Sequence, residues 1–540
     1  MKRTLLLRPS TAAGRRSTTK IGLAIATVMA ATLIVLEANT SVGGAAGPET
    51  LPLFQLGNLQ YSGAFRVPKG TFGASSFSLA GVSSGSLAYN PAGNSLFILG
   101  NDQDFPKHVA EISIPTLSTS LTMSAWPTAT VVQPFVDPAE GTAGAAMLNQ
   151  DYKAGGLLVF GTQLYASNWI YYDGNGAQSV SHYRRPLNLS DRGHVEGFYK
   201  LMSGTTNLTG YVSGGMALVP AAWRAPLGGT ILSEQSGIPI PSRTTFGQSA
   251  VVWDPASFGP STPATPLMYF TTDHPISGST ANSSGYDAVS RVWNGSTEIR
   301  GVVFPEGYRS VLYFGRQGLT YCYGQGVNLD PSIPGSQVVE SNGGSGANAS
   351  TDSTGRVVSL PNVRTNALPG DWVWLKDQTS PNIDGKHPGA SYVTSYANSG
   401  APNATVTVAA GFPPGLANQR FNAGSLDCFD PFDVGSKGNH GYPYVTQVWA
   451  YDAADLLAVK NGQKQPWDPR PYGLWDISAR FPAWNATGDV CGAAYDPATG
   501  RIFLCVPAID GDAPAIYVFS MGASGSTNPP ATPRNVRIMR

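Results

Sequence analysis

Two hairpin sequences far apart in the chain decide the fold: Ala88-Tyr-Asn-Pro-Ala-Gly-Asn-Ser-Leu-Phe-Ile-Leu99 and Ala494-Tyr-Asp-Pro-Ala-Thr-Gly-Arg-Ile-Phe-Leu-Cys505. Each reads as a strand, a tight turn containing Asn-Pro or Asp-Pro, and a second strand. A looser third copy covers residues 302–314. Hairpins that recur along a long chain indicate a radial repeat of small antiparallel sheets.

The two Ala-Tyr-[Asn/Asp]-Pro-Ala hairpins resemble those of bacterial secreted β-propellers. The resemblance covers the repeated sheets and is architectural. Five-bladed propellers include several families of secreted glycosidases that act on arabinan, fructan and related glycans, with acidic residues around a central funnel. No catalytic motif of such a family is matched in this chain, so the resemblance implies a fold and assigns no catalytic residue.

The hairpin template divides the chain into five predicted blades of an all-β propeller, with six blades or another all-β arrangement as alternatives. A strand at 61–67 is left over at the N-terminal side, and we expect it to complete the fifth blade and close the ring. The predicted strands are 86–90, 95–100, 109–114 and 130–135; 156–160, 163–168, 179–184 and 197–201; 215–219, 230–234, 249–253 and 267–272; 299–304, 310–315, 446–451 and 472–477; and 491–495, 502–506 and 516–520.

The composition agrees with many short strands joined by turns. The chain has 540 residues with 63 Gly and 42 Pro, and only 13% of its residues are charged. Such a balance is typical of all-β proteins with frequent turns. The formal net charge is zero, so no electrostatic feature favours a nucleic-acid partner.

The N-terminal residues 1–47 are interpreted as an export signal. Basic residues precede an apolar run at 21–36, and small residues follow it. The run is short for a membrane span, although an uncleaved anchor is the alternative. We therefore expect a secreted or cell-surface protein whose mature chain has no transmembrane span.

The four cysteines favour two disulfides in an exported chain. Cys491 and Cys505 each lie seven residues from Ala498 at the centre of a predicted hairpin turn, so we expect them to face each other and bond. A bond between Cys322 and Cys428 would close the neck of an insertion. Metal binding is the competing interpretation, but the chain has no Cys-x-x-Cys motif.

The insertion interrupts the fourth predicted blade. Residues 319–441 replace a short connection, and strand-like runs occur at 356–360, 371–375, 391–396 and 404–409. The predicted organisation is therefore 1–47 export signal, 48–318 propeller, 319–441 inserted β module, 442–521 propeller and 522–540 flexible tail.

A candidate site follows from propeller geometry. The ends of the second and fourth strands of each blade and the start of the next first strand lie on one face of such a ring, so polar residues at these points would gather around one mouth of the channel. The alternative for each acid is a turn residue that bonds its own backbone. The candidate catalytic residues are Asp102, Asp104, Glu234, Asp273 and His274, and the candidate substrate-binding residues are Trp169, Asp173, Arg316 and Asp489.

These side chains favour a carbohydrate-active protein. Aromatic rings stack on sugar faces, and paired carboxylates supply the acid and the nucleophile or base of a glycoside hydrolase, which we expect more than a polysaccharide lyase. The alternative is a non-catalytic propeller that binds glycan or protein at the cell surface.

No cofactor is expected; Asp427, Asp430 and Asp433 are the candidate calcium ligands, but they miss the EF-hand spacing. We expect a monomer whose partner is an extracellular glycan or a surface protein.

Overall fold

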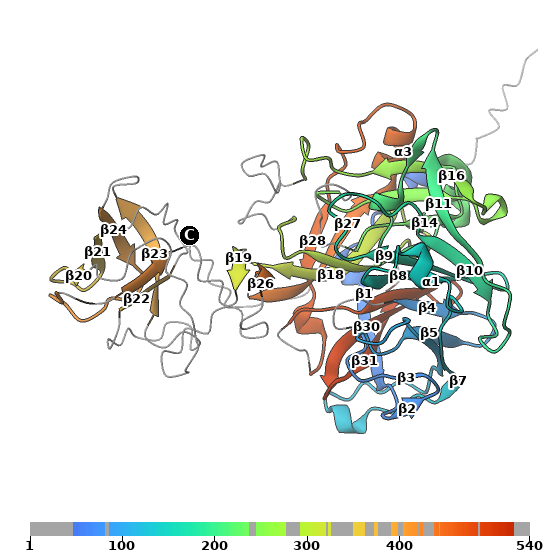
Figure 1. Cartoon of the computed structure of the whole chain (residues 1–540), viewed down its shortest axis with the longest axis horizontal. Coiled ribbons are helices and arrows are strands. Elements are labelled where there is room, and N and C mark those ends of the chain that lie inside the picture. The colour runs from blue at the N-terminus through green and yellow to red at the C-terminus, as the bar shows by residue number, and fades with distance from the viewer. Residues whose placement is uncertain are drawn as a thin grey trace, which may run out of the picture. The chain divides into compact units, whose positions relative to one another are not determined.

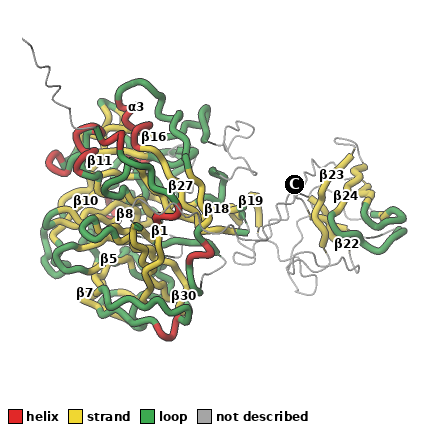
Figure 2. The backbone as a smooth tube through the Cα atoms, turned by 180° about the vertical axis from the view of Figure 1, so that it is seen from behind, coloured by secondary structure: helices red, strands yellow, loops and turns green. Residues whose placement is uncertain are grey.

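The structure is a computed structural model. It describes residues 47–81, 86–236, 245–276, 292–319, 322–325, 349–361, 372–375, 390–397, 403–417, 419, 421–424, 437–441, 443–483 and 487–522. As predicted, the chain is mostly β. Figure 2 shows strands and loops with a few short helices, of which the α-helices are α1 (Ala143–Ala146), α2 (Ala221–Leu227) and α3 (Ala453–Lys460).

Most strands form five four-stranded antiparallel groups, which we call meanders one to five. Successive strands of each meander are hydrogen-bonded neighbours. Meander one is β4 (Leu87–Asn90), β5 (Ser95–Leu99), β6 (Val109–Ser113) and β7 (Val131–Val136); meander two is β8 (Tyr152–Phe160), β9 (Gln163–Ile170), β10 (His182–Pro186) and β11 (Glu196–Ser203). Meander three is β13 (Met216–Leu218), β14 (Ile231–Ser233), β15 (Ala250–Trp253) and β16 (Ser261–Met268); meander four is β17 (Glu298–Val303), β18 (Ser310–Gly318), β27 (Tyr444–Asp452) and β28 (Gly473–Asp476). Meander five is β29 (Gly492–Asp496), β30 (Arg501–Asp510), β31 (Ala513–Met521) and β1 (Leu59–Arg66).

The predicted closure by the N-terminal strand is confirmed as a strand pairing. β1 pairs antiparallel with β31, with Ala64 opposite Tyr517. Figure 1 shows the blue β1 beside the red β30 and β31, so segments from the two ends of the described chain share one sheet. This pairing covers a strand edge that would otherwise be free to bind another chain.

The repeated hairpins form as the sequence predicts. Asn90 and Asp496 each accept a hydrogen bond from the backbone N–H two residues on, at Ala92 and Ala498. This side-chain bond is the one that Asn and Asp offer in tight turns. The two copies therefore share a turn mechanism as well as a sequence.

The disulfide between Cys491 and Cys505 is present, with 4.9 Å between the two Cα atoms. The register differs by one residue from the prediction, because Gly492 and not Cys491 lies opposite Cys505. The Cys491 N–H still donates to the Cys505 carbonyl, which holds the two residues close enough to bond. Cys428 lies outside the described residues, so its pairing with Cys322 stays a prediction.

Meanders two and three are joined, which the sequence did not predict. β11 pairs in parallel with β16, with Lys200 beside Ser261, and β12 (Thr206–Asn207) adds to β11. The result is one nine-stranded sheet. β16 also begins and ends earlier than the predicted strand at 267–272, because this pairing engages its first residues.

Five hydrophobic clusters lie between successive meanders and form a closed cycle. Each cluster contains residues from two neighbouring meanders. Ala88 and Leu157 lie in the cluster between meanders one and two, Tyr165 and Trp253 in that between two and three, and Leu232 and Tyr313 in that between three and four. Phe314 and Tyr517 lie in the cluster between meanders four and five, and Phe503 and Ile98 in that between five and one. Each sheet is therefore buried on both faces by its two neighbours, which explains strands that are apolar without alternation, such as β5.

The first strands of the five meanders contact one another in the same cycle. Glycines allow the approach: a Cβ added at Gly301 would lie 2.4 Å from Ala493 Cβ, and one at Gly492 would lie 2.8 Å from Leu87 Cβ. Any side chain at these two positions would force the neighbouring strand outward. We call the level of close approach the glycine waist, and its members are Ser86, Gly155, Gly215, Gly301 and Gly492.

The insertion contains its own strands and core. Its six-stranded sheet has the order β20 (Ser350–Thr351), β21 (Val357–Pro361), β24 (Asn403–Val408), β23 (Ala390–Ala397), β22 (Trp372–Leu375) and β25 (Phe421–Gly424). Val358, Val373 and Val406 are among the residues of its separate buried cluster. Two shorter pairs complete the described strands: β19 (Cys322–Gln325) with β26 (Lys437–His440), and β2 (Thr71–Phe72) with β3 (Ser75–Ser76).

Candidate functional site

Polar side chains gather where the first strands begin. β17 starts at Glu298, which lies directly opposite Arg316 near the end of β18. Asp489 lies three residues before β29, and Glu234 follows β14 by one residue. Each of these residues lies at or near the start of a first strand or the end of a second strand, as the sequence predicts for site residues. Neighbouring meanders therefore present them at the same end of their strands.

Arg316 bridges two carboxylates. Its Nη2 lies 2.6 Å from Glu298 Oε1, and its Nη1 lies 3.1 Å from Asp489 Oδ1. Arg300 donates to the other oxygen of Glu298. We call Glu298, Arg300, Arg316 and Asp489 the Arg316 cluster. The side chains of Arg316, Glu298 and Asp489 are 18%, 11% and 16% exposed, so the cluster is largely buried.

The two acids of the cluster have pKa values shifted in opposite directions. Burial raises the pKa of Asp489 to about 6, against the opposing effect of Arg316. Burial also acts to raise the pKa of Glu298, but Arg316 and Arg300 together outweigh it and hold that pKa below its usual value. Near pH 5 the cluster therefore contains one protonated and one ionised carboxyl group.

Glu234 is a fully buried acid close to Arg300 of the cluster. Its Oε1 accepts a hydrogen bond from the Gly215 N–H, while its Oε2 has no hydrogen-bond partner within the described residues. Burial raises the pKa of Glu234 well above its usual value, although the Gly215 N–H and Arg300 oppose the shift. Arg300 thus links Glu234 electrostatically to the Arg316 cluster.

Aromatic rings from the end of β9 lie beside these charges. The Tyr171 ring centroid is 5.9 Å from that of Trp169 and 4.5 Å from that of Tyr172, and Tyr172 is 75% exposed. Burial raises the pKa of Tyr171 to about 12, with Tyr172 and Glu298 adding to the shift, so its hydroxyl lies near the cluster. The ring of Tyr444 at the start of β27 has its centroid 4.6 Å from the Arg316 guanidinium carbon.

Meander one carries a second charged group after β5. Lys107 Nζ is 3.9 Å from the buried Asp102 carboxylate and donates to the Asp102 carbonyl. Asp104 accepts a hydrogen bond from Ser75 and lies 3.9 Å from His108 Nδ1. Burial lowers the pKa of Lys107, and Lys107 also packs over the exposed ring of Phe105.

The structure thus brings three predicted residues to one place: Arg316 and Asp489 in direct contact, and Glu234 through Arg300. Trp169 is connected with them by its ring contact with Tyr171, which lies near Glu298. Asp102 and Asp104 belong to the second group. The Asp173 carboxylate accepts hydrogen bonds from the Ala177 and Gln178 backbone N–H groups, as a turn-capping acid does.

Asp273 and His274 have different surroundings. Asp273 is exposed, and the His274 ring stacks on Trp467 with 4.2 Å between centroids. Several residues of these groups were not predicted from the sequence, among them Glu298, Arg300, Lys107 and the tyrosines Tyr171, Tyr172 and Tyr444. Glu298 was missed because the predicted strand began one residue later, at Ile299. A bulge between Ile299 and Gly301 also shifts the register by one residue, and without it Glu298 would lie opposite Gln317 instead of Arg316.

Within the described ranges no group of three or more His, Cys, Asp or Glu side chains is arranged to hold a metal ion. The candidate calcium ligands Asp427, Asp430 and Asp433 lie outside the described residues. None of the helices in the part of the chain that the structure describes combines the length and apolar character that a membrane crossing requires.

Comparison with known proteins yields no family. No family model and no curated protein sequence matches the chain. Among solved structures, the chain is similar to a luciferin-regenerating enzyme (TM-score 0.27, 8% identity, 81% of this chain and 76% of that one) and to the phage phi92 endosialidase (TM-score 0.14, 10% identity, 83% and 45%). It is also similar to a europium-containing methanol dehydrogenase (TM-score 0.22, 10% identity, 87% and 95%). These scores are too low to support an argument about function.

Proposed function

We propose that the five meanders are the blades of a five-bladed β-propeller closed by β1, and that the Arg316 cluster at one end of its channel cleaves a glycosidic bond in an extracellular glycan. The cycle of clusters between meanders supports the architecture. The observation that carries the function is the pair of carboxyl groups on one guanidinium, one with a raised and one with a lowered pKa. Pairs of acids whose pKa values are pushed apart mark acid and base roles.

The roles follow from the protonation states. Protonated Asp489 donates its proton to the glycosidic oxygen as the bond to the leaving sugar breaks. Ionised Glu298 stabilises the positive charge that develops on the sugar ring and serves as nucleophile or base. Arg316 holds both side chains in place. The exposed ring of Tyr172 offers a face on which a sugar unit stacks.

Export of the protein is part of the same proposal. The Cys491–Cys505 disulfide supports it, because disulfides persist in oxidising compartments.

The test is hydrolysis of a panel of plant and microbial polysaccharides by the wild type and by Asp489→Asn. We expect Asp489→Asn to lower kcat by about 10²–10⁴-fold, the usual contribution of a general acid. Wild-type activity should fall as the pH rises through about 6, where Asp489 loses its proton, and this limb should be absent from the variant. Glu306→Gln is the matched control, because Glu306 is an exposed acid in the turn between β17 and β18.

A second candidate is glycan binding without cleavage. It is favoured because both acids are ion-paired with Arg316, as they would be in a network that only holds the shape of a binding site. In that case the wild type releases no sugar from any polymer, while Tyr172→Ala weakens binding on a glycan array. Cleavage by Asp489→Asn at the wild-type rate would remove Asp489 from the mechanism.

A further inference from the structure

A separate apolar cavity lies on the other side of the glycine waist. It contains ≈ 540 Å³ of empty space, part of which is open to solvent, and its wall is formed by the first strands of all five meanders, β4, β8, β13, β17 and β29. None of the described residues in its wall is charged. Both repeated hairpins contribute to it, with Tyr89 and Pro91 from one and Tyr495 and Pro497 from the other.

The cavity and the Arg316 cluster are at opposite ends of the same strands. Along β17 the order is Glu298, then Gly301 in the waist, then Val302 in the cavity wall. Before and along β29 the order is Asp489, Gly492 and Ala493. At the waist, a Cβ at Gly215 would lie 3.1 Å from Gly301 Cα, and Ser86 donates to the Gly155 carbonyl. The backbone contacts therefore separate a polar end from an apolar end.

The few polar groups of the wall already have partners in the protein. The Tyr89 hydroxyl donates to Asn94 Oδ1 at 3.2 Å, and the Tyr495 hydroxyl accepts from the Glu306 N–H at 3.2 Å. A charged ligand would lose its hydration on entering this cavity and would find no partner for its charge. A neutral ring compound avoids this cost of burying a charge.

We propose that this cavity is a binding site for a small neutral aromatic molecule. Apolar cavities in proteins take up apolar ring compounds. Phe304 and Met216 add an aromatic edge and a polarizable sulfur to the wall, both of which contact rings favourably. The opening is bordered by partly exposed residues, among them Leu158 and Leu218.

The experiment is calorimetric and NMR titration of the full chain with p-cresol and with 4-hydroxybenzoate at pH 7. The two probes share a phenol ring, but 4-hydroxybenzoate carries a carboxylate. We expect p-cresol to bind and 4-hydroxybenzoate to bind at least about tenfold more weakly, because its charge has no partner in the cavity. Leu218→Trp, which places a larger ring at the opening, should weaken p-cresol binding by at least about tenfold, since overfilled apolar space resists insertion.

Leu474→Trp is the matched control, because Leu474 is a partly exposed leucine of β28 that does not line the cavity. It should bind p-cresol as the wild type does. Thermal unfolding of both variants shows whether they fold, and Leu158→Trp replaces Leu218→Trp if the latter does not. No p-cresol binding by the wild type, equal affinity for both probes, or undiminished binding by a folded Leu218→Trp would each overturn the proposal.

Discussion

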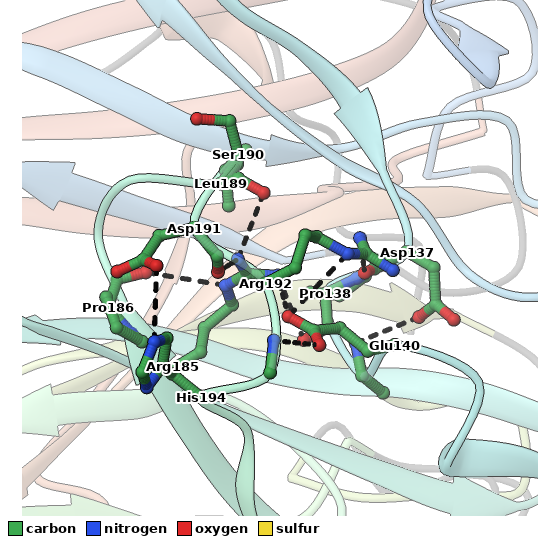
Figure 3. A network of polar contacts seen from close by, with 12 residues as sticks. Asp137, Pro138, Glu140, Arg185, Pro186, Leu189, Ser190, Asp191, Arg192 and His194 are labelled. Carbon is green, nitrogen blue, oxygen red and sulfur yellow. Dashed lines mark hydrogen bonds and ion pairs between the residues drawn. The ribbon is translucent and has the colours of Figure 1, made fainter.

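At the scale of single residues, Arg185 shows how a buried charge fixes two loops that the sheets alone do not hold. Figure 3 shows its guanidinium among backbone carbonyls and Glu140. The side chain is fully buried and donates to the carbonyls of Leu189 at 3.0 Å and Asp191 at 2.9 Å, and across to Pro138 at 3.4 Å. Glu140, 3.6 Å away, balances the charge and also accepts from the Gly193 N–H. The connections before β8 and after β10 thus share one cation.

We expect Arg185→Met to lower the free energy of unfolding by about 3–5 kcal/mol, because it leaves several carbonyls buried without a donor and removes the buried cation beside Glu140. Arg192→Met is the control: Arg192 contacts the same Glu140 at 3.8 Å, but its side chain is 52% exposed. Its loss should cost no more than about 1 kcal/mol. Urea unfolding at pH 7 measures both, and equal losses would show that burial of the cation is not what matters.

At the scale of elements, the β29–β30 hairpin is held by turn, register and disulfide together. The Asp496 carboxylate caps the turn by bonding Ala498, Thr499 and Arg501, and burial of Cys491 and Cys505 places the disulfide in the core between meanders five and one. Replacing both cysteines by alanine should lower the free energy of unfolding by about 3 kcal/mol, the usual effect of a loop near 15 residues. Urea unfolding checks the value, and non-reducing peptide mapping of the wild type checks the bond. An unchanged midpoint would mean that the bond contributes nothing beyond packing.

The same elements show which features the sequence can predict. Hairpins with Asn-Pro or Asp-Pro turns are local, so their strands were located to within a few residues, and the unpaired strand near Tyr61 implied the closure that β1 makes with β31. The parallel pairing of β11 with β16 is long-range and has no local signal. The site was predicted in part for the same reason. Strand ends placed Arg316, Asp489 and Glu234 on one level, but the bridge through Glu298 and Arg300 depends on register and side-chain direction.

At the scale of the whole molecule, the position of the insertion allows the meanders to be tested without it. β18 ends at Gly318 and β27 begins at Tyr444, and these two residues lie directly opposite each other in the ladder. The Leu319 N–H donates to the Pro443 carbonyl just beyond them. Residues 319–443 therefore leave and return at the closed end of a hairpin, which a two-residue Asn-Gly turn can connect.

We expect a chain in which Asn-Gly replaces residues 319–443 to fold and to unfold cooperatively. The five clusters between meanders contain no residue of the insertion, whose described core is the separate cluster around Val358 and Val406. Tyr444 keeps its place against Arg316, although its hydroxyl loses the Gly441 N–H. Loss of that one hydrogen bond should cost about 1 kcal/mol and lower Tm by about 2–4 °C. Circular dichroism melting measures the change, and the Cys491–Cys505 bond reports correct folding of meander five. A shortened chain that is unfolded, or that melts in two steps, would show that the meanders need the insertion to fold together.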